Sequence, residues 1–245
     1  MTDCNPINTP MDPGTRLQKR EGPANREDSK LPYRELIGSL MYLAVATRPD
    51  IAYTVRYLSQ FLTCCDKTHW AAAKRVLRYL KHTMDLSIEY GRTDEPLKGY
   101  VDADWANCPI DRRSYTGYAY VLASGAISWN SRKQQTVALS STEAEYMALA
   151  EAVKEAVFLH AFLVELGFRQ LADVNIYNDN TGASRMADNP VFHNRTKHID
   201  VRHHFVRDLI KNGHITLGHV STGDIGNRER LGMAGPVESR IEGKY

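Results

Sequence analysis

Residues 98–105 read Lys-Gly-Tyr-Val-Asp-Ala-Asp-Trp, a short apolar run that ends in two aspartates. The run predicts a core β-strand, and because side chains alternate between the two faces of a strand, Asp102 and Asp104 share one face. A carboxylate at the end of a buried strand needs a cation or a metal as a partner, since burying it unpaired is costly. A turn cap is the simpler interpretation of this stretch alone, and two later segments decide between them.

A long helix with an inward carboxylate is predicted after residue 140. Residues 140–146 read Ser-Ser-Thr-Glu-Ala-Glu-Tyr, and the helical pattern continues to Leu166. Counting in helical steps places Glu145 on the apolar stripe and Glu143 on the wet face. The apolar stripe with Glu145 contains Ala148, Leu149, Ala152, Val153, Ala156, Leu159 and Leu163. The wet face with Glu143 contains Tyr146, Met147, Ala150, Glu151, Lys154 and Glu155. A partner such as a metal explains the inward position of Glu145.

A third acid follows another short strand. Residues 174–180 read Val-Asn-Ile-Tyr-Asn-Asp-Asn, a strand that ends in Asp179 and leads into a helix-like segment. Asp102, Glu145 and Asp179 therefore stand at the ends of three core elements. Their composition is that of an oxygen-only site for Mg²⁺ or Mn²⁺, hard cations that prefer carboxylates and water.

These motifs resemble the RNase H domain of Ty1/copia-type retrotransposon polyproteins. Upstream, residues 33–43 (Tyr-Arg-Glu-Leu-Ile-Gly-Ser-Leu-Met-Tyr-Leu) and 47–51 (Thr-Arg-Pro-Asp-Ile) resemble the tail of the same family's reverse transcriptase, so the likeness covers roughly residues 1–222. The resemblance implies that the catalytic and metal-binding acids are Asp102, Glu145 and Asp179. It assigns no such role to Asp104 or Glu143.

The activity implied by the resemblance is metal-dependent cleavage of the RNA strand of RNA–DNA hybrids. Two metals about 4 Å apart activate a water and stabilise the leaving 3′ oxygen in such a reaction. After Thr222 the family has an Asp-x-x-Ala-Asp segment whose last acid is a fourth ligand, whereas here Arg228 takes its place and Asp224 can substitute only with a changed loop. We therefore expect the binding of at least one metal to be weakened.

The polymerase's own metal site is missing from the amino-terminal part. Its Tyr-x-Asp-Asp motif has no counterpart in residues 1–90. We expect no polymerase activity from this chain.

The predicted fold is α/β, an RNase H-like mixed five-stranded sheet with flanking helices, preceded by a small helical unit. We expect an extended or disordered arm at 1–31, a helical reverse-transcriptase tail at 32–85, an RNase H-like domain at 86–222 and a divergent, disordered tail at 223–245. Strand-like segments occur at 86–90, 97–102, 115–122, 126–130, 136–139, 174–178 and 214–220.

Composition sets ordinary bounds. The 245 residues are 42% hydrophobic and carry a formal net charge of only +2, so nucleic-acid contacts must come from local patches. The four cysteines lack zinc-site spacing and indicate a reducing compartment, the cytoplasm or the nucleus. No apolar run approaches the roughly 18 residues of a membrane span, so we expect no membrane partner.

A local basic patch is predicted on a helix at residues 68–82. Its apolar side contains Trp70, Ala73, Leu77 and Leu80. Lys74, Arg78 and Lys81, followed by His82, form a ridge on the other side. The ridge is either a solvated face or a contact surface for a nucleic-acid backbone, which needs clustered cations rather than specific bases.

Two further function classes stay open. Arg75-Val76-Leu77-Arg78 matches the host-targeting motif of secreted RxLR-type pathogen effectors, although no signal peptide precedes it. A retroelement-derived effector of this kind would be secreted into a host cell and would act on a host protein. A non-catalytic nucleic-acid-binding remnant would keep the fold and the basic ridge without turnover.

Overall fold

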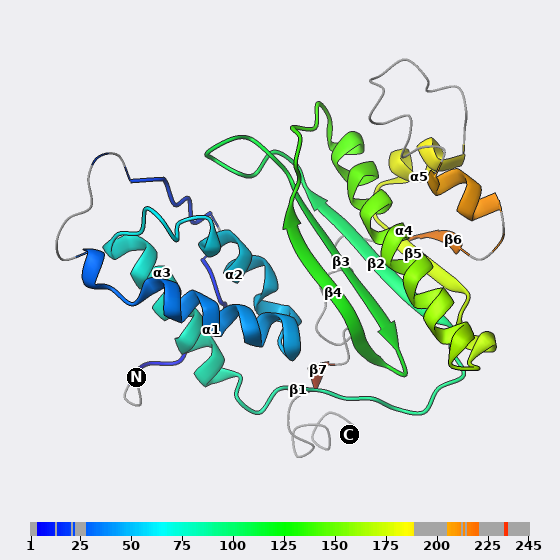
Figure 1. The fold of residues 1–245 in the computed structure, drawn as a ribbon, viewed down its shortest axis with the longest axis horizontal. Coiled ribbons are helices and arrows are strands. Elements are labelled where there is room, and N and C mark those ends of the chain that lie inside the picture. Colours follow the sequence, from blue (N-terminus) through cyan, green and yellow to red (C-terminus); the bar gives the residue numbers. More distant parts are fainter. Residues whose placement is uncertain are drawn as a thin grey trace, which may run out of the picture. The chain divides into compact units, whose positions relative to one another are not determined.

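The computed structural model describes residues 4–12, 14–20, 22, 28–188, 205–211, 213, 215–220 and 233–234. The chain forms two compact units (Figure 1), one containing the helices that precede Ser87 and one containing residues 88–108 and 112–234. None of the described helices is both long enough and apolar enough to cross a lipid bilayer.

The first unit is built from three α-helices. They are α1 (Tyr33–Ala46), α2 (Ala52–Ser59) and α3 (Lys67–His82), with short 3-10 turns η1 (Asp28–Lys30) and η2 (Pro49–Ile51) before α1 and α2. The Asp66 carboxylate caps α3 by accepting hydrogen bonds from the backbone N–H groups of Thr68 and His69. The apolar core of this unit includes Tyr33, Ile37, Leu40, Val55, Leu58 and Phe61.

The buried side of α3 differs from the predicted one. The buried residues are His69, Ala73, Val76 and Tyr79, whereas the predicted Trp70, Leu77 and Leu80 are half-buried. His69 Nδ1 lies 2.7 Å from the Asp66 carboxylate, and the Tyr79 hydroxyl donates to Asp50. These hydrogen bonds satisfy the Tyr79 hydroxyl and the Nδ1 atom of His69, which helps both side chains to be buried in place of more apolar residues.

A buried ion pair joins the α1–α2 connection to the end of α3. Arg48 donates from Nε and Nη2 to the two carboxylate oxygens of Asp50, at 3.0 and 2.8 Å, and from Nη1 to the Thr83 carbonyl oxygen at 3.1 Å. Only 10% of the Arg48 side chain and 5% of the Asp50 side chain are exposed. Because both charges are buried, removing one would leave the other without compensation.

The second unit contains a mixed five-stranded sheet in the order β4-β3-β2-β5-β6. Its central strand β2 (Leu97–Asp104) is antiparallel to β3 (Tyr115–Leu122), which is antiparallel to β4 (Gly125–Lys133). On the other side β2 is parallel to β5 (Val174–Asn178), and β5 is parallel to β6 (Ile215–His219). The predicted mixed five-stranded sheet with flanking helices is confirmed.

Two segments predicted as strands lie outside this sheet. From residues 86–90 only β1 (Ser87–Ile88) is a strand, and it pairs with β7 (Met233–Ala234). Residues 136–139 form a loop, because the Leu139 N–H donates to the Glu143 carboxylate at 2.8 Å instead of to a neighbouring strand. This contact belongs to the start of the next helix.

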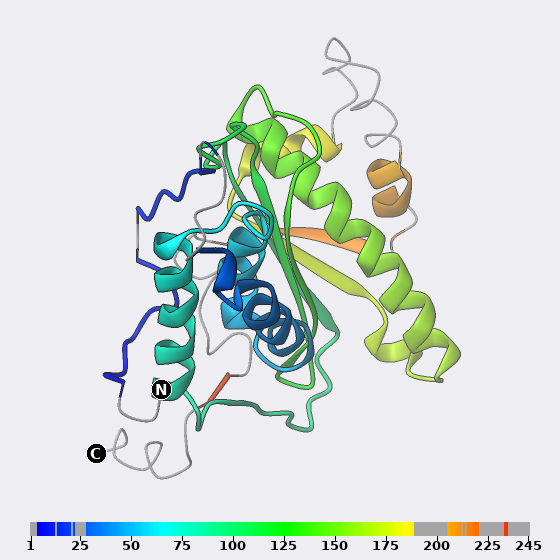
Figure 2. The same cartoon turned by 60° about the vertical axis from the view of Figure 1, so that its left-hand side comes forward.

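The long helix α4 (Ser141–Glu165) lies across one face of the sheet (Figure 2). All seven residues of its predicted apolar stripe are buried, as is Glu145. Tyr146, Met147 and Ala150, predicted on the wet face, are also buried. The reason is that α4 packs against β2, β3 and the short helix α5 (Thr181–Asp188), so its first half is covered on more than one side.

A close approach between strand and ring fixes α4 on the sheet. The Tyr120 ring lies over Gly99, where a Cβ atom would come within 2.6 Å of the ring. The Tyr120 hydroxyl then donates to the Ala152 carbonyl oxygen of α4 at 2.6 Å. Glycine at position 99 is therefore required for a contact that holds the helix over β2.

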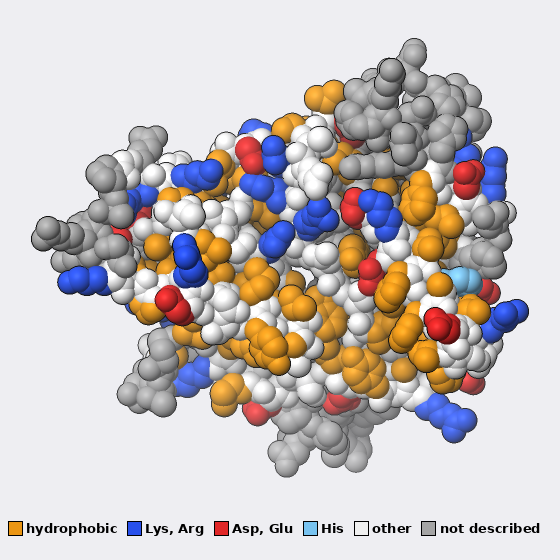
Figure 3. All heavy atoms as spheres, viewed as in Figure 1, with side chains coloured by type: hydrophobic (Ala, Val, Ile, Leu, Met, Phe, Trp, Pro, Cys, Tyr) orange, Lys and Arg blue, Asp and Glu red, His pale blue; other side chains and the backbone are white. Residues whose placement is uncertain are grey.

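The second half of α4 carries an apolar surface. Phe158, Phe162 and Leu166 are exposed, and hydrophobic side chains gather along this helix in Figure 3. The rings of Phe158 and Phe162 stack with their centroids 6.1 Å apart. This surface lies at the opposite end of α4 from Glu145.

Replacing Arg48 with Met should lower the free energy of unfolding of the helical unit by about 3 kcal/mol, because the buried Asp50 carboxylate would lose the positive charge that balances it. Arg56→Met, at an exposed position of α2, is the matched control and should change it by about 0.5 kcal/mol or less. Urea unfolding of the full chain, followed by circular dichroism, measures both. Equal midpoints for the two variants would contradict a stabilising role for this ion pair.

Candidate metal centre

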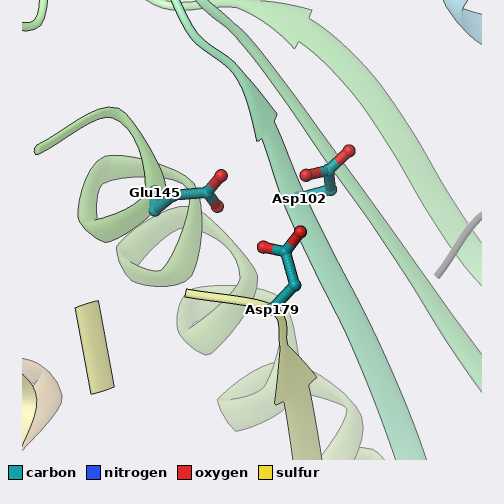
Figure 4. Close-up of side chains that lie close together, drawn as sticks. All are labelled: Asp102, Glu145 and Asp179. Atoms are coloured by element: carbon teal, nitrogen blue, oxygen red, sulfur yellow. The ribbon is translucent and has the colours of Figure 1, made fainter. Parts of the chain in front are cut away.

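Three carboxylates from three elements converge at one edge of the sheet (Figure 4). Asp102 lies on β2, Glu145 lies near the start of α4, and Asp179 follows directly after β5. One carboxylate oxygen of each lies within 4.8 Å of the others, and no other such group of potential metal ligands occurs among the described residues. The structure therefore brings together the three acids that the sequence singled out.

The parallel pairing of β2 and β5 explains why two of the acids meet. Tyr100 is paired with Tyr177, and their rings stack with centroids 5.5 Å apart. Asp102 and Asp179 each follow two residues after these partners. Because parallel strands run in the same direction, both acids reach the same edge of the sheet.

The third acid is delivered by the start of α4. The Ser140 hydroxyl accepts a hydrogen bond from the Glu143 N–H at 3.1 Å and so caps the helix. Two residues after Glu143, the Glu145 carboxyl group points toward Asp102 and Asp179 (Figure 4). Glu145 is only 7% exposed, and its Oε2 atom has no hydrogen-bond partner in the described part of the chain. A buried, unpaired carboxylate oxygen calls for a ligand.

Electrostatics gives the same indication. Burial, together with the charges of Asp102 and Asp179, raises the pKa of Glu145 to about 8, although the Ala103 N–H acts in the opposite direction. Burial and the neighbouring Asp179 also raise the pKa of Asp102. Three carboxylates at this spacing repel one another, and a divalent cation would relieve the repulsion. The all-carboxylate donor set fits Mg²⁺ or Mn²⁺.

The two neighbouring acids have other partners. Asp104 accepts a hydrogen bond from the side-chain amide of Asn107, and Glu143 accepts one from the Leu139 N–H. Neither belongs to the three-carboxylate group. Asp104 stabilises the turn after β2, and Glu143 stabilises the first turn of α4.

The sequence predicts that Arg228 replaces the fourth acidic ligand and that Asp224 is its only nearby substitute. Arg228 and Asp224 both lie outside the described residues.

The predicted basic ridge is partly occupied by the arm at residues 4–12. Arg78 Nε donates to the Asn5 carbonyl oxygen at 2.7 Å, and Lys81 Nζ donates to the Cys4 carbonyl oxygen at 3.0 Å. Lys74 Nζ instead lies 5.9 Å from the centroid of the Trp70 ring. The arm therefore supplies oxygen acceptors where phosphate oxygens were expected.

The Arg-x-Leu-Arg match lies within α3 and takes part in packing. Arg75 donates to the Thr9 hydroxyl at 2.9 Å and pairs with Asp12 at 2.6 Å. Val76 is fully buried, and Leu77 is half-buried. In this fold the motif is a helical segment whose side chains already have partners.

One residue beside the metal centre was missed from the sequence. Gln134, directly after β4, is buried and donates from Nε2 to the Thr116 hydroxyl and to the Ala144 carbonyl oxygen. A single polar residue between a strand and a loop has no periodicity that could reveal it. The one signal in the sequence was the predicted pairing of the strands at 115–122 and 126–130, since Gln134 follows the second of them.

A mixed sheet in this order, with one acid on its central strand, one on the helix that covers it and one after the neighbouring parallel strand, defines an RNase H-like domain. The chain is 42% identical over 228 residues to the retrovirus-related Pol polyprotein from transposon TNT 1-94 of Nicotiana tabacum and 42% identical over 226 residues to that from transposon RE1 of Arabidopsis thaliana. Both matches cover 91% of this chain. The chain belongs to the family of copia-type retrotransposon Pol polyproteins.

The chain spans only 17% and 15% of the length of these two polyproteins. It is also 54% identical over 130 residues to the secreted RxLR effector protein 161 of Plasmopara viticola, a match that covers 53% of this chain and 92% of the effector. Among solved structures it is similar to LC11-RNase H1 in complex with an RNA/DNA hybrid, at 13% identity and a TM-score of 0.40, covering 59% of this chain and 99% of that one. No protein-family model matches the chain.

The metal-free chain should become less stable as the pH rises from about 4.5 to about 8. Over this range the unfolded state loses the Glu145 proton while the folded state keeps it, because the pKa rises from its ordinary value of 4.5 to about 8 on folding. Glu145→Gln lacks this effect, so at pH 8.5 its melting temperature in EDTA should exceed that of the wild type by about 2–4 °C or more.

The control is Glu165→Gln, which changes an exposed residue at the far end of the same helix. It should keep the wild-type pH profile when melting is followed between pH 4.5 and 9. Parallel profiles for all three chains would mean that Glu145 is not buried beside like charges.

Proposed function

We propose that this chain is a metal-dependent nuclease that cleaves the RNA strand of RNA–DNA hybrids. The observation that carries the proposal is the convergence of Asp102, Glu145 and Asp179, with an unpartnered oxygen on the buried Glu145. Membership of the Pol family supports the assignment of this site to RNase H chemistry. We place the enzyme in the cytoplasm or the nucleus, because none of its four cysteines forms a disulfide in the described part of the chain.

The three carboxylates have complementary tasks in this proposal. Asp102, Glu145 and Asp179 would hold Mg²⁺ or Mn²⁺, which when bound activates a water and stabilises the leaving 3′ oxygen. The packing of α4 on the sheet fixes the position of the Glu145 carboxylate on the core side of the site. Asp102 and Asp179 are half-buried and therefore remain accessible from the surface, where a phosphate backbone would approach.

The metal affinity is proposed to be lower than in a site with four acids. Arg228 stands where the resemblance places the fourth acid, and a guanidinium stays charged at working pH. Calorimetric Mg²⁺ titration of the parent chain and of Arg228→Asp tests this: tighter binding by the variant supports it, and equal binding discards it.

We propose that Lys74, Arg78 and Lys81 on α3 contact the nucleic-acid backbone. Two of these cations already bind carbonyl oxygens of the arm, so the arm and a phosphate backbone would compete for the same donors. Such contacts carry no sequence preference and are weakened by salt.

A secreted RxLR-type effector role is the second proposal. The 54% identity to the Plasmopara viticola effector supports it. The helical packing of Arg75, Val76 and Arg78 argues against recognition of the motif in the folded chain, because its side chains are already engaged. Detection of the intact chain outside the cells that make it, and then in a host cell, would favour the effector over the nuclease.

Asp102→Asn, Glu145→Gln and Asp179→Asn should each lower Mg²⁺-dependent hybrid cleavage by about 100-fold or more, since each removes a ligand charge. Asp104→Asn is the matched control on the same strand and should stay within about twofold. A gel assay with a 5′-labelled RNA strand annealed to DNA measures the four variants. A loss of activity in Asp104→Asn equal to that in Asp102→Asn would overturn the assignment of the ligands.

Removing residues 1–5 should strengthen binding to an RNA–DNA hybrid, because it takes away the Asn5 and Cys4 carbonyl oxygens that bind Arg78 and Lys81 and leaves Thr9 and Asp12 in place. Two freed phosphate contacts should steepen the dependence of log K on log salt by about 1.8. Fluorescence anisotropy at several salt concentrations, in EDTA to prevent cleavage, measures the change. Adding Arg78→Gln and Lys81→Gln to the shortened chain should abolish the gain, and a gain that persists would exclude these residues as its source.

A further inference from the structure

Gln134 forms a bridge between the sheet and the first turn of α4. It is 6% exposed, and its backbone N–H donates to the Ser114 carbonyl oxygen at 2.8 Å, which extends the β3–β4 pairing by one step. Its Nε2 atom donates to the Thr116 hydroxyl at 3.1 Å and to the Ala144 carbonyl oxygen at 2.9 Å. The side chain is therefore anchored in the sheet and reaches the helix.

The orientation of this amide follows from its partner. The Ala144 carbonyl oxygen can only accept, so the atom that faces it must be the nitrogen of the Gln134 amide. The Oε1 atom on the other side is buried without a partner in the described part of the chain. Leaving this oxygen unpaired costs stability. Exceptions to the rule that buried polar atoms are hydrogen-bonded occur mainly at functional sites.

We propose that Gln134 is a positioning residue that sets the separation between Glu145 and Asp102, a role that rests on the proposed metal-dependent function. The Ala144 carbonyl and the Glu145 N–H belong to one rigid peptide unit. The other partner, Thr116, is paired with Ala103, the residue after Asp102. One amide group thus connects the peptide that carries Glu145 with the strand beside the one that carries Asp102.

The metal centre needs such a bridge because its own charges oppose its geometry. Glu145 and Asp102 repel each other when both are ionised, and this repulsion pushes the first turn of α4 away from β2. The Tyr120 contact with Ala152 holds the helix two turns further on and leaves the first turn to other contacts. Gln134 acts one residue from Glu145 and so resists the displacement where it arises.

The test compares Gln134→Met, which keeps the length of the side chain but removes its donor, with Gln135→Met at the exposed neighbouring position. Crystal structures of the metal-free full chains, grown above pH 8 so that both carboxyl groups are ionised, should show the separation of the Asp102 and Glu145 carboxylate oxygens widening beyond 4.8 Å only in Gln134→Met. Calorimetry should show its Mg²⁺ affinity falling about 10-fold. Hybrid cleavage should lose kcat at fixed Mg²⁺ with KM for the hybrid unchanged, and raising Mg²⁺ should restore it.

Thr116→Val keeps the shape of the side chain and removes one partner of the Gln134 amide, so it provides the test if Gln134→Met fails to fold. It should change the carboxylate separation, the Mg²⁺ affinity and kcat in the same direction as Gln134→Met, but by less. A folded Gln134→Met chain with the wild-type carboxylate separation and Mg²⁺ affinity would overturn the positioning role. If the wild type binds Mg²⁺ but cleaves no hybrid, the proposed function fails while the separation still decides the role of Gln134.

Discussion

The structure of the second unit depends on keeping one carboxyl group, that of Glu145, inside the protein beside two others. Burying it requires that α4 sit close to β2, and Gly99 makes this approach achievable by leaving room for the Tyr120 ring. The same closeness raises the pKa of Glu145, because water is excluded and Asp102 is near. Packing and charge are therefore opposed at this point, and a divalent cation is the simplest way to reconcile them.

Where a charged side chain had to face inward, the sequence was a good guide. Glu145 stands out because helical spacing places it among apolar residues, and Asp102 and Asp179 stand out because each ends an apolar strand. Spacing failed on α3, where hydrogen bonds to Asp66 and Asp50 allow His69 and Tyr79 to be buried instead of Trp70 and Leu77. It also failed at residues 136–139, where a helix cap takes the N–H that a strand would use. Both errors came from hydrogen bonds to residues outside the segment whose pattern was read.

The helical unit shows how one set of cations permits several interpretations. Arg78 and Lys81 belong to the ridge that was predicted to be a solvated face or a nucleic-acid surface, and Arg75 and Arg78 belong to the predicted targeting motif. Their contacts with Asp12, Asn5 and Cys4 show that they also fix the amino-terminal arm. Spacing in a sequence cannot separate these roles, since long cationic side chains bind carbonyl, carboxylate and phosphate oxygens alike.

The topology of the sheet also predicts the order in which its strands pair during folding. The β2–β3–β4 part consists of neighbouring antiparallel strands with short connections, so it can form early. The strand β5 can pair with β2 only after α4 has crossed the sheet, which closes a much longer loop. Until then β2 has an open edge that can pair with another chain. During synthesis from the amino terminus Asp179 is the last of the three acids to arrive, so the group of carboxylates is completed by the same late step that covers the open edge of β2.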